Sequence, residues 1–264
     1  MKKLLGFSIF LVFVLIASLT AEAKVTLPAI FSDNMVLQQN TQVNVWGKAA
    51  PGEKVTVKAS WLDKPVTAKA AANGKWTVKL KTPKATTNQS VTVSGENEIT
   101  INNVLIGEVW LCTGQSNMEF PVSRHPDVKW NTGMLNEAEE LKDADYPEIR
   151  LFHVKHLLAH EGELDDCEGE WLVCNPKNLY DFSAVGFVFG RKLYKELKMP
   201  VGLIQSTWGG THAESWTKLD VMKKNPLYAD VLKDFALEGV KQQKNYCKVP
   251  ATLWNGMIPV SYTH

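Results

Sequence analysis

The sequence lacks a strong net charge. Its 264 residues contain 29 Lys and Arg against 28 Asp and Glu, which gives a formal net charge of +1. Proteins that bind nucleic acids or anionic membranes usually carry a basic patch or stripe, so this composition gives no reason to expect either partner. A neutral ligand fits it better. The nine tryptophans either present flat apolar surfaces, as those of sugar-binding proteins do, or fill the core.

Cysteine is also scarce, and no two of the four cysteines have the Cys-x-x-Cys spacing of a zinc site. Cys112 lies in an apolar stretch and is predicted to be a buried thiol. Cys167 and Cys174 are close enough in sequence to pair, but the sequence alone does not determine the pairing. No motif for an organic cofactor occurs either, so the sequence predicts neither a metal nor a cofactor.

Long apolar runs are absent apart from residues 4–19. This run follows Lys2 and Lys3 and precedes Ala21-Glu-Ala23, a pattern that predicts a secretory signal peptide over residues 1–23. The run is short for a membrane span, and no second one follows. We therefore expect a secreted or periplasmic protein that is not held in the membrane after signal cleavage. Its oligomeric state is not predicted.

Residues 24–103 show apolar residues alternating with polar ones, which is typical of half-buried strands. The alternating pairs are Val43 and Val45, Val55 and Val57, Trp76 and Val78, Val91 and Val93, and Ile99 and Ile101. Turn-forming residues fall between them at Pro51-Gly52, Asn73-Gly74 and Gly95. The pattern predicts a small antiparallel β-sandwich module over residues 24–103, acting either as a platform or as a carbohydrate-binding unit.

The pattern changes at residue 104. Residues 104–112 form a nearly continuous apolar run, as in strands that are covered on both faces. Further on, the sequence predicts a helix within residues 131–144, strands at 149–154 and 201–206, and a helix with Ser183 as its N-cap. That helix has an apolar face formed by Val185, Phe189, Leu193 and Leu197. Alternating strands and helices predict an α/β domain with a parallel sheet over residues 104–264.

Ser116 is the candidate nucleophile because it follows the first of these buried strands, and open α/β sheets carry their chemistry at the carboxyl ends of strands. Gly114 permits a sharp turn there, and Gln115 and Asn117 keep the surroundings polar. Met118 stands where the nucleophile elbow G-x-S-x-G has its second glycine, which disfavours the α/β-hydrolase fold. Without further support, an ordinary capped turn explains these residues as well.

Gly209 and Gly210 follow the second buried strand, and without a Cβ their N–H groups can closely approach an oxyanion. The alternative is a turn that simply needs a positive φ. A serine mechanism also needs a base. His212 is the candidate by position, because the remaining histidines are scattered along the chain at His125, His153, His156, His160 and His264.

Eight blocks of the sequence resemble the sialate O-acetylesterases, which are carbohydrate esterases of the SGNH-hydrolase type. They cover residues 27–38, 45–57, 74–76, 107–119, 182–186, 201–204, 208–211 and 255–258, with Gly114-Gln-Ser-Asn-Met118 as the most specific. The resemblance implies a β-rich module before a flavodoxin-like α/β domain that hydrolyses O-acetyl esters of sialic acids. It also implies that Ser116 is the nucleophile, with its own N–H and that of Gly210 as oxyanion donors.

The sequence departs from the family pattern at its end. Family members continue into a strand ending Trp-Tyr-Gln-Gly-Glu-Ser and, later, into an Asp-x-x-His segment that carries the base, whereas this sequence stops at His264. We therefore expect residues 104–264 to be the N-terminal part of the esterase domain, with an incomplete parallel sheet and without the base. The alternatives are an acetyl-xylan or other polysaccharide deacetylase, a non-catalytic glycan-binding protein, and an inactive fragment.

Overall fold

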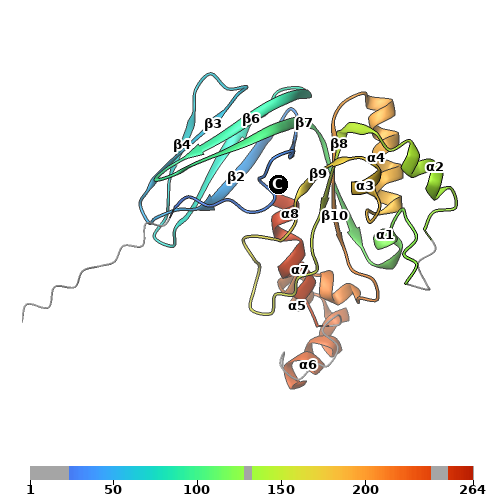
Figure 1. Ribbon diagram of the computed structural model, residues 1–264. Helices are drawn as coiled ribbons and strands as arrows, with labels where there is room; N and C mark the ends of the chain where they lie inside the picture. Colours follow the sequence, from blue (N-terminus) through green and yellow to red (C-terminus); the bar gives the residue numbers. More distant parts are fainter. Residues whose placement is uncertain (1–23, 128–132, 239–248, 264) are drawn as a thin grey trace, which may run out of the picture.

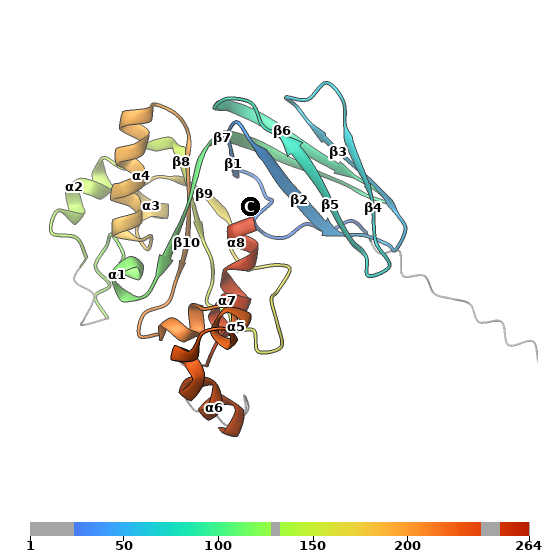
Figure 2. The same cartoon turned by 180° about the vertical axis from the view of Figure 1, so that it is seen from behind.

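The computed structural model describes residues 24–127, 133–238 and 249–263. The predicted signal peptide, residues 1–23, lies outside this range. Within the described ranges, no helix has the length and apolar character needed to cross a membrane. A β-rich part and an α/β part lie side by side and share one long strand (Figures 1 and 2).

The β-rich part is built from the strands that the alternating pattern predicts. Strands β2 (Gln42–Lys48) and β5 (Lys75–Lys81) pair antiparallel in one sheet. The second sheet has the order β4 (Val66–Lys69), β3 (Lys54–Ala59), β6 (Thr86–Ser94) and β7 (Glu98–Gly114). In β5, every second residue is buried. These strands confirm the predicted alternation between a buried and an exposed face.

Strand β7 belongs to both parts of the molecule. It pairs antiparallel with β6 up to Ile106, then parallel with β1 (Val36–Gln38), and from Glu108 to Gly114 parallel with β10 (Val201–Thr207). At the crossing, Gly107 lies so close to the carbonyl of Pro200 that a Cβ would overlap it. The boundary predicted between residues 103 and 104 falls within this strand, so the two parts share a backbone element.

The α/β part has the strand order β7, β10, β8 (Tyr146–His153) and β9 (Trp171–Cys174). Strands β7, β10 and β8 run parallel, while β9 is antiparallel to β8. All seven residues of β10 are buried, as predicted for a strand covered on both faces. The α/β class and the parallel sheet are confirmed. The sequence did not predict the antiparallel direction of β9.

Helices cover the sheet on both faces. The face turned away from the β-rich part carries four helices, namely α1 (Ser116–Glu119), α2 (Glu137–Lys142), α3 (Pro176–Leu179) and α4 (Ala184–Leu197) (Figures 1 and 2). Helix α2 lies within the predicted helix at residues 131–144, part of which falls outside the described residues.

The remaining helices follow β10 in the chain. They are the short 3-10 helices η1 (Ala213–Trp216) and η2 (Pro226–Tyr228) and the helices α5 (Leu219–Lys223), α6 (Ala229–Glu238), α7 (Thr252–Met257) and α8 (Pro259–Thr263). Helices α7 and α8 lie on the face of the sheet turned toward the β-rich part, with α8 next to that part and α7 further from it (Figures 1 and 2).

Helix α4 begins as predicted but buries a different face. Ser183 is its N-cap, with its hydroxyl accepting a hydrogen bond from the Gly186 N–H at 3.0 Å. The predicted apolar face is wrong, because three of its four residues are exposed: Val185 (53%), Phe189 (39%) and Leu197 (44%). The buried face contains Gly186, Phe187 and Gly190, with Gly190 directly against Leu203. Glycines allow α4 to approach β10 closely, which larger side chains would prevent.

The described residues form two hydrophobic cores. One runs without a break from the β-rich part to the near face of the sheet, where it contains Phe152, Trp171, Ile204 and Met257. The other lies between the sheet and the helices of the far face and contains Phe187.

The three cysteines of the described residues are free thiols. Cys112 is 5% exposed, which confirms the predicted burial, and that burial raises its pKa to about 11. Cys167 and Cys174 are both buried and do not pair with one another. Burial raises the pKa of each to about 12. These thiols are therefore protonated, inert members of the core.

Candidate active site

Ser116 lies at the turn that ends β7. Gly114, the last residue of the strand, has a φ of +147°, a conformation that glycine adopts without steric cost. Gln115 follows, and α1 starts at Ser116, whose side chain is exposed. Within residues 24–127, 133–238 and 249–263, the Ser116 Oγ hydrogen-bonds to Gln115 Oε1 at 3.4 Å and to no histidine.

The end of β10 lies beside Ser116. Thr207 is the register partner of Gly114, and the Trp208 N–H donates to the Gly114 carbonyl at 3.2 Å. A Cβ built on Gly209 would lie 3.2 Å from the Ser116 Oγ. Gln115 connects the two segments further, since its Nε2 donates to the Thr211 carbonyl at 3.0 Å. The structure thus brings together the two strand-end segments that the sequence singled out.

The two glycines of this turn have different environments. The Gly209 N–H donates to Glu119 Oε2 at 2.6 Å, so a carboxylate already engages it. Gly210 is exposed with a φ of +73°, and its N–H makes no hydrogen bond to any residue that the structure describes. Of the two glycine N–H groups, that of Gly210 is therefore the one left to donate to an oxyanion. Asn117 is exposed on α1 beside Ser116.

Glu119 and His156 form a pair that the sequence analysis missed. His156 Nε2 lies 2.9 Å from Glu119 Oε1 and 3.0 Å from the carbonyl of Thr207. Because both partners are acceptors, we assign the imidazole proton to Nε2. The His156 ring also stacks on Trp208, with centroids 4.0 Å apart and planes at 4°. One signal for this pair was present in the sequence, namely that Glu119 directly follows the Gly114–Met118 motif. Nothing in the sequence linked Glu119 to His156, because the two residues are 37 positions apart.

The charge of Glu119 is stabilised in place. Burial raises the pKa of its carboxyl. The hydrogen bonds from His156 and from the Gly209 N–H, together with the nearby His156 and His153, lower the pKa by more than burial raises it. The net effect is a pKa below the usual value, so Glu119 is a carboxylate near neutral pH. His212, the base candidate from the sequence, lies exposed before η1, and the described contacts do not join it to Ser116.

A cavity of about 640 Å³ adjoins the Glu119–His156 pair. It is lined by Glu119, His153, Lys155, His156, Gly169, Glu170 and Leu172. This volume falls within the range of small-molecule sites. In the described part of the chain, no group of three or more His, Cys, Asp or Glu side chains is arranged to hold a metal ion.

Comparison with known proteins decides the family. Residues 106–256 match the family described as carbohydrate esterase, sialic acid-specific acetylesterase. The chain belongs to this family. The esterase region includes both strand ends, with Ser116, Glu119, His156 and the Gly209-Gly210 turn.

Other carbohydrate esterases are similar to this chain. The sialate O-acetylesterase of Mus musculus is 34% identical over 215 residues, covering 74% of this chain and 38% of that protein. The Homo sapiens sialate O-acetylesterase is 34% identical over 205 residues, covering 70% of this chain and 37% of that protein. The chain thus spans less than two fifths of the length of these relatives.

One solved structure also matches most of the chain. The crystal structure of a carbohydrate acetylesterase from Xanthomonas citri has a TM-score of 0.72 and 30% sequence identity to this chain. The match covers 90% of this chain and 48% of that protein. The mixed α/β fold with its β-rich module is therefore that of a carbohydrate esterase.

Proposed function

We propose that the chain carries the nucleophile of an esterase that removes O-acetyl groups from sialic acids. The observation that supports this most is the position of the Ser116 hydroxyl against the Gly209-Gly210 turn, at the adjoining carboxyl ends of β7 and β10, in a member of an acetylesterase family. A nucleophile and a backbone donor at one sheet edge are the two parts that acyl transfer needs first.

The reaction proceeds in two steps. The Ser116 Oγ attacks the acetyl carbonyl carbon and forms a new C–O bond, while a general base takes the hydroxyl proton. The N–H groups of Ser116 and Gly210 stabilise the negative oxygen of the tetrahedral intermediate. The sugar oxygen then leaves with the proton. Water attacks the acetyl-serine in the second step and releases acetate.

We propose that the base comes from the Asp-x-x-His segment that the family resemblance places downstream. Hydrolases that lose a triad member keep part of their rate enhancement through the oxyanion donors and substrate binding. Among the residues that the structure describes, no histidine hydrogen-bonds to the Ser116 Oγ, so these residues by themselves are expected to react slowly with activated acetyl esters.

The cavity beside Glu119 and His156 is the proposed site of the sugar. Its lining includes Lys155, whose ammonium group supplies positive charge for the carboxylate of a sialic acid. Acetylated xylan is the alternative substrate, and its backbone has no carboxylate for this lysine to bind. A lysine contact to the substrate carboxylate favours the sialic acid.

Acetate release separates these outcomes. We expect the purified chain to release acetate from 4-nitrophenyl acetate and, more slowly, from O-acetylated sialic acid. Ser116→Ala is expected to abolish both reactions, while Ser60→Ala, at an exposed serine of the β-rich part, leaves both unchanged. Turnover that survives Ser116→Ala contradicts the serine mechanism. Faster release of acetate from acetylated xylan than from O-acetylated sialic acid contradicts sialic acid as the substrate.

Export is a separate proposal. From the predicted signal peptide over residues 1–23, we propose that the protein is secreted or periplasmic. Amino-terminal sequencing of the protein recovered from its native compartment is expected to begin at Lys24. A mature chain that retains residues 1–23 contradicts this.

A further inference from the structure

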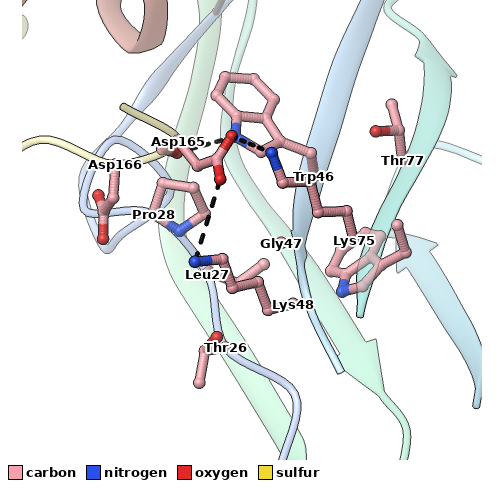
Figure 3. A pocket seen from close by; sticks show the side chains of 11 residues that line it. Thr26, Leu27, Pro28, Trp46, Gly47, Lys48, Lys75, Thr77, Asp165 and Asp166 are labelled. Carbon is pink, nitrogen blue, oxygen red and sulfur yellow. Dashed lines mark hydrogen bonds and ion pairs between the residues drawn. The ribbon is translucent and has the colours of Figure 1, made fainter. Parts of the chain in front are cut away.

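A second pocket lies where the β-rich part meets the segment between β8 and β9. It has a volume of about 300 Å³ and is lined by Thr26, Leu27, Pro28, Trp46, Gly47, Lys48, Lys75, Trp76, Thr77, Asp165 and Asp166 (Figure 3). None of these residues belongs to the Ser116 site. The pocket therefore needs an explanation of its own.

Trp46 gives the pocket a rigid flat surface. The ring of Phe31 packs edge-on against it, with centroids 4.6 Å apart and planes at 81°. The Trp46 Nε1 donates to the carbonyl of Asp165 at 3.3 Å, which fixes the indole from the other side of the pocket (Figure 3). A held, half-buried indole offers a large amphipathic contact area at low entropic cost. The C–H faces of a sugar ring are suited to such a surface.

Charged groups surround the indole in balanced numbers. The Asp165 carboxylate lies between two lysines, 2.7 Å from Lys75 Nζ and 4.0 Å from Lys48 Nζ (Figure 3). Asp166 accepts a hydrogen bond from the Ala29 N–H at 2.9 Å. Two lysines and two aspartates give no net charge. A phosphate or carboxylate therefore gains little here, whereas sugar hydroxyls find both donors and acceptors.

The pocket is larger than the surface of one indole. Trp76 also lines it but is only 2% exposed, so the half-buried Trp46 is the indole that a ligand can reach. Two neighbouring cavities, of about 330 and 370 Å³, share Asp165 with this pocket and extend it along the segment from Glu163 to Glu168.

We propose that this pocket binds an uncharged oligosaccharide, with one sugar ring stacked on Trp46 and its hydroxyls bonded to Asp165 and Lys75. It is an accessory glycan site, separate from the Ser116 edge. Such a site would hold the protein on the neutral sugars of a glycan that carries acetyl groups. The binding itself does not depend on the proposed esterase function, because the probes below carry no ester.

Isothermal titration calorimetry of the full chain with cellohexaose, xylohexaose and maltohexaose tests the proposal, with 3′-sialyllactose as the charged comparison. We expect at least one neutral hexaose to bind. Trp46→Ala is expected to weaken that binding about tenfold, because stacking is lost. Asp165→Asn, which keeps the shape of the pocket, is expected to weaken it as well. Circular dichroism confirms that each variant is folded.

The matched control is Trp61→Ala, which removes another indole of the β-rich part whose Nε1 bonds to the Lys81 carbonyl. It is expected to leave the affinity unchanged. The proposal is overturned if no neutral hexaose binds, if only sialyllactose binds, or if folded Trp46→Ala and Asp165→Asn both bind as the wild type does. Loss of binding in Ser116→Ala also overturns it, because the ligand would then occupy the active-site edge.

Discussion

At the scale of single residues, Glu119 connects the parts of the candidate site. Its carboxylate accepts hydrogen bonds from the Gly209 N–H of one strand-end turn and from His156, while its own backbone belongs to the helix that starts at Ser116. His156 in turn donates to the Thr207 carbonyl at the end of β10. Glu119 thus positions the glycine turn relative to the nucleophile.

Glu119→Ala is expected to lower the free energy of unfolding by about 1.5–3 kcal/mol, because it removes charge-assisted hydrogen bonds and leaves the Gly209 N–H unpaired. Urea denaturation of the purified chain measures the change. The control is Glu139→Ala, at an exposed glutamate of α2, with an expected effect within about 0.5 kcal/mol. Equal effects of the two substitutions contradict the role of Glu119.

The contribution of Glu119 to the free energy of unfolding decreases as the pH falls. Its pKa is lower in the folded state than the usual glutamate value of about 4.3, so the stabilisation is fully present above that value and is lost as the pH falls through the folded pKa. The stability difference between the wild type and Glu119→Gln is expected to shrink as the pH falls below the usual glutamate value of about 4.3. A difference that stays constant over this range contradicts the assignment.

The sequence predicted part of this site for a physical reason. Ser116 and Gly209 each follow a buried strand, and parallel strands bring such positions to one edge. Glu119 and His156 have no such relation in the sequence. They meet only through the packing of α1 against the segment after β8, so the pair became visible only in the structure.

At the scale of elements, α4 shows the limit of reading a helix face from apolar spacing. The start of the helix was predictable because a serine N-cap acts locally. The buried face was not, because it is selected by the closeness of Gly190 to Leu203 on β10. The larger residues Val185 and Phe189 are left exposed as a result.

Two phenylalanines of α4 test this packing. Phe187 is fully buried, so Phe187→Ala is expected to destabilise the fold by about 3–5 kcal/mol. Phe189 is 39% exposed, and its ring meets Trp110 with centroids 5.1 Å apart, so Phe189→Ala is expected to cost less than half as much. Thermal unfolding of both variants measures the two effects. A larger loss of stability for Phe189→Ala than for Phe187→Ala contradicts this packing and supports the apolar face that the sequence predicted.

At the scale of the whole molecule, β7 and the continuous core join the two parts. Buried Arg150 on β8 adds polar contacts, donating to Asn34 Oδ1 at 3.1 Å and to Asn103 Oδ1 at 3.3 Å. The sequence located the change of pattern near residue 104, because strands covered on one face and on two faces differ in composition. It did not show that one strand carries both patterns, since strand length and pairing depend on partners distant in sequence.

The shared strand predicts that both parts unfold together. Urea denaturation followed by far-ultraviolet circular dichroism and by tryptophan fluorescence is expected to give one coincident transition. Gly107→Ala, which places a methyl group against the Pro200 carbonyl, is expected to lower the midpoint of both signals equally. Two separate transitions, or a midpoint shift in only one signal, contradict the account of β7 as a common element.

The central claim is that Ser116 is the residue that takes the acetyl group, and mass spectrometry of the acid-quenched chain after exposure to 4-nitrophenyl acetate tests it most directly. We expect a hydroxylamine-sensitive acetyl ester on the peptide that contains Ser116. It forms faster there than at exposed Ser60 and is absent from Ser116→Ala. An acetyl ester that forms elsewhere at the same rate, or no ester on Ser116, contradicts the account.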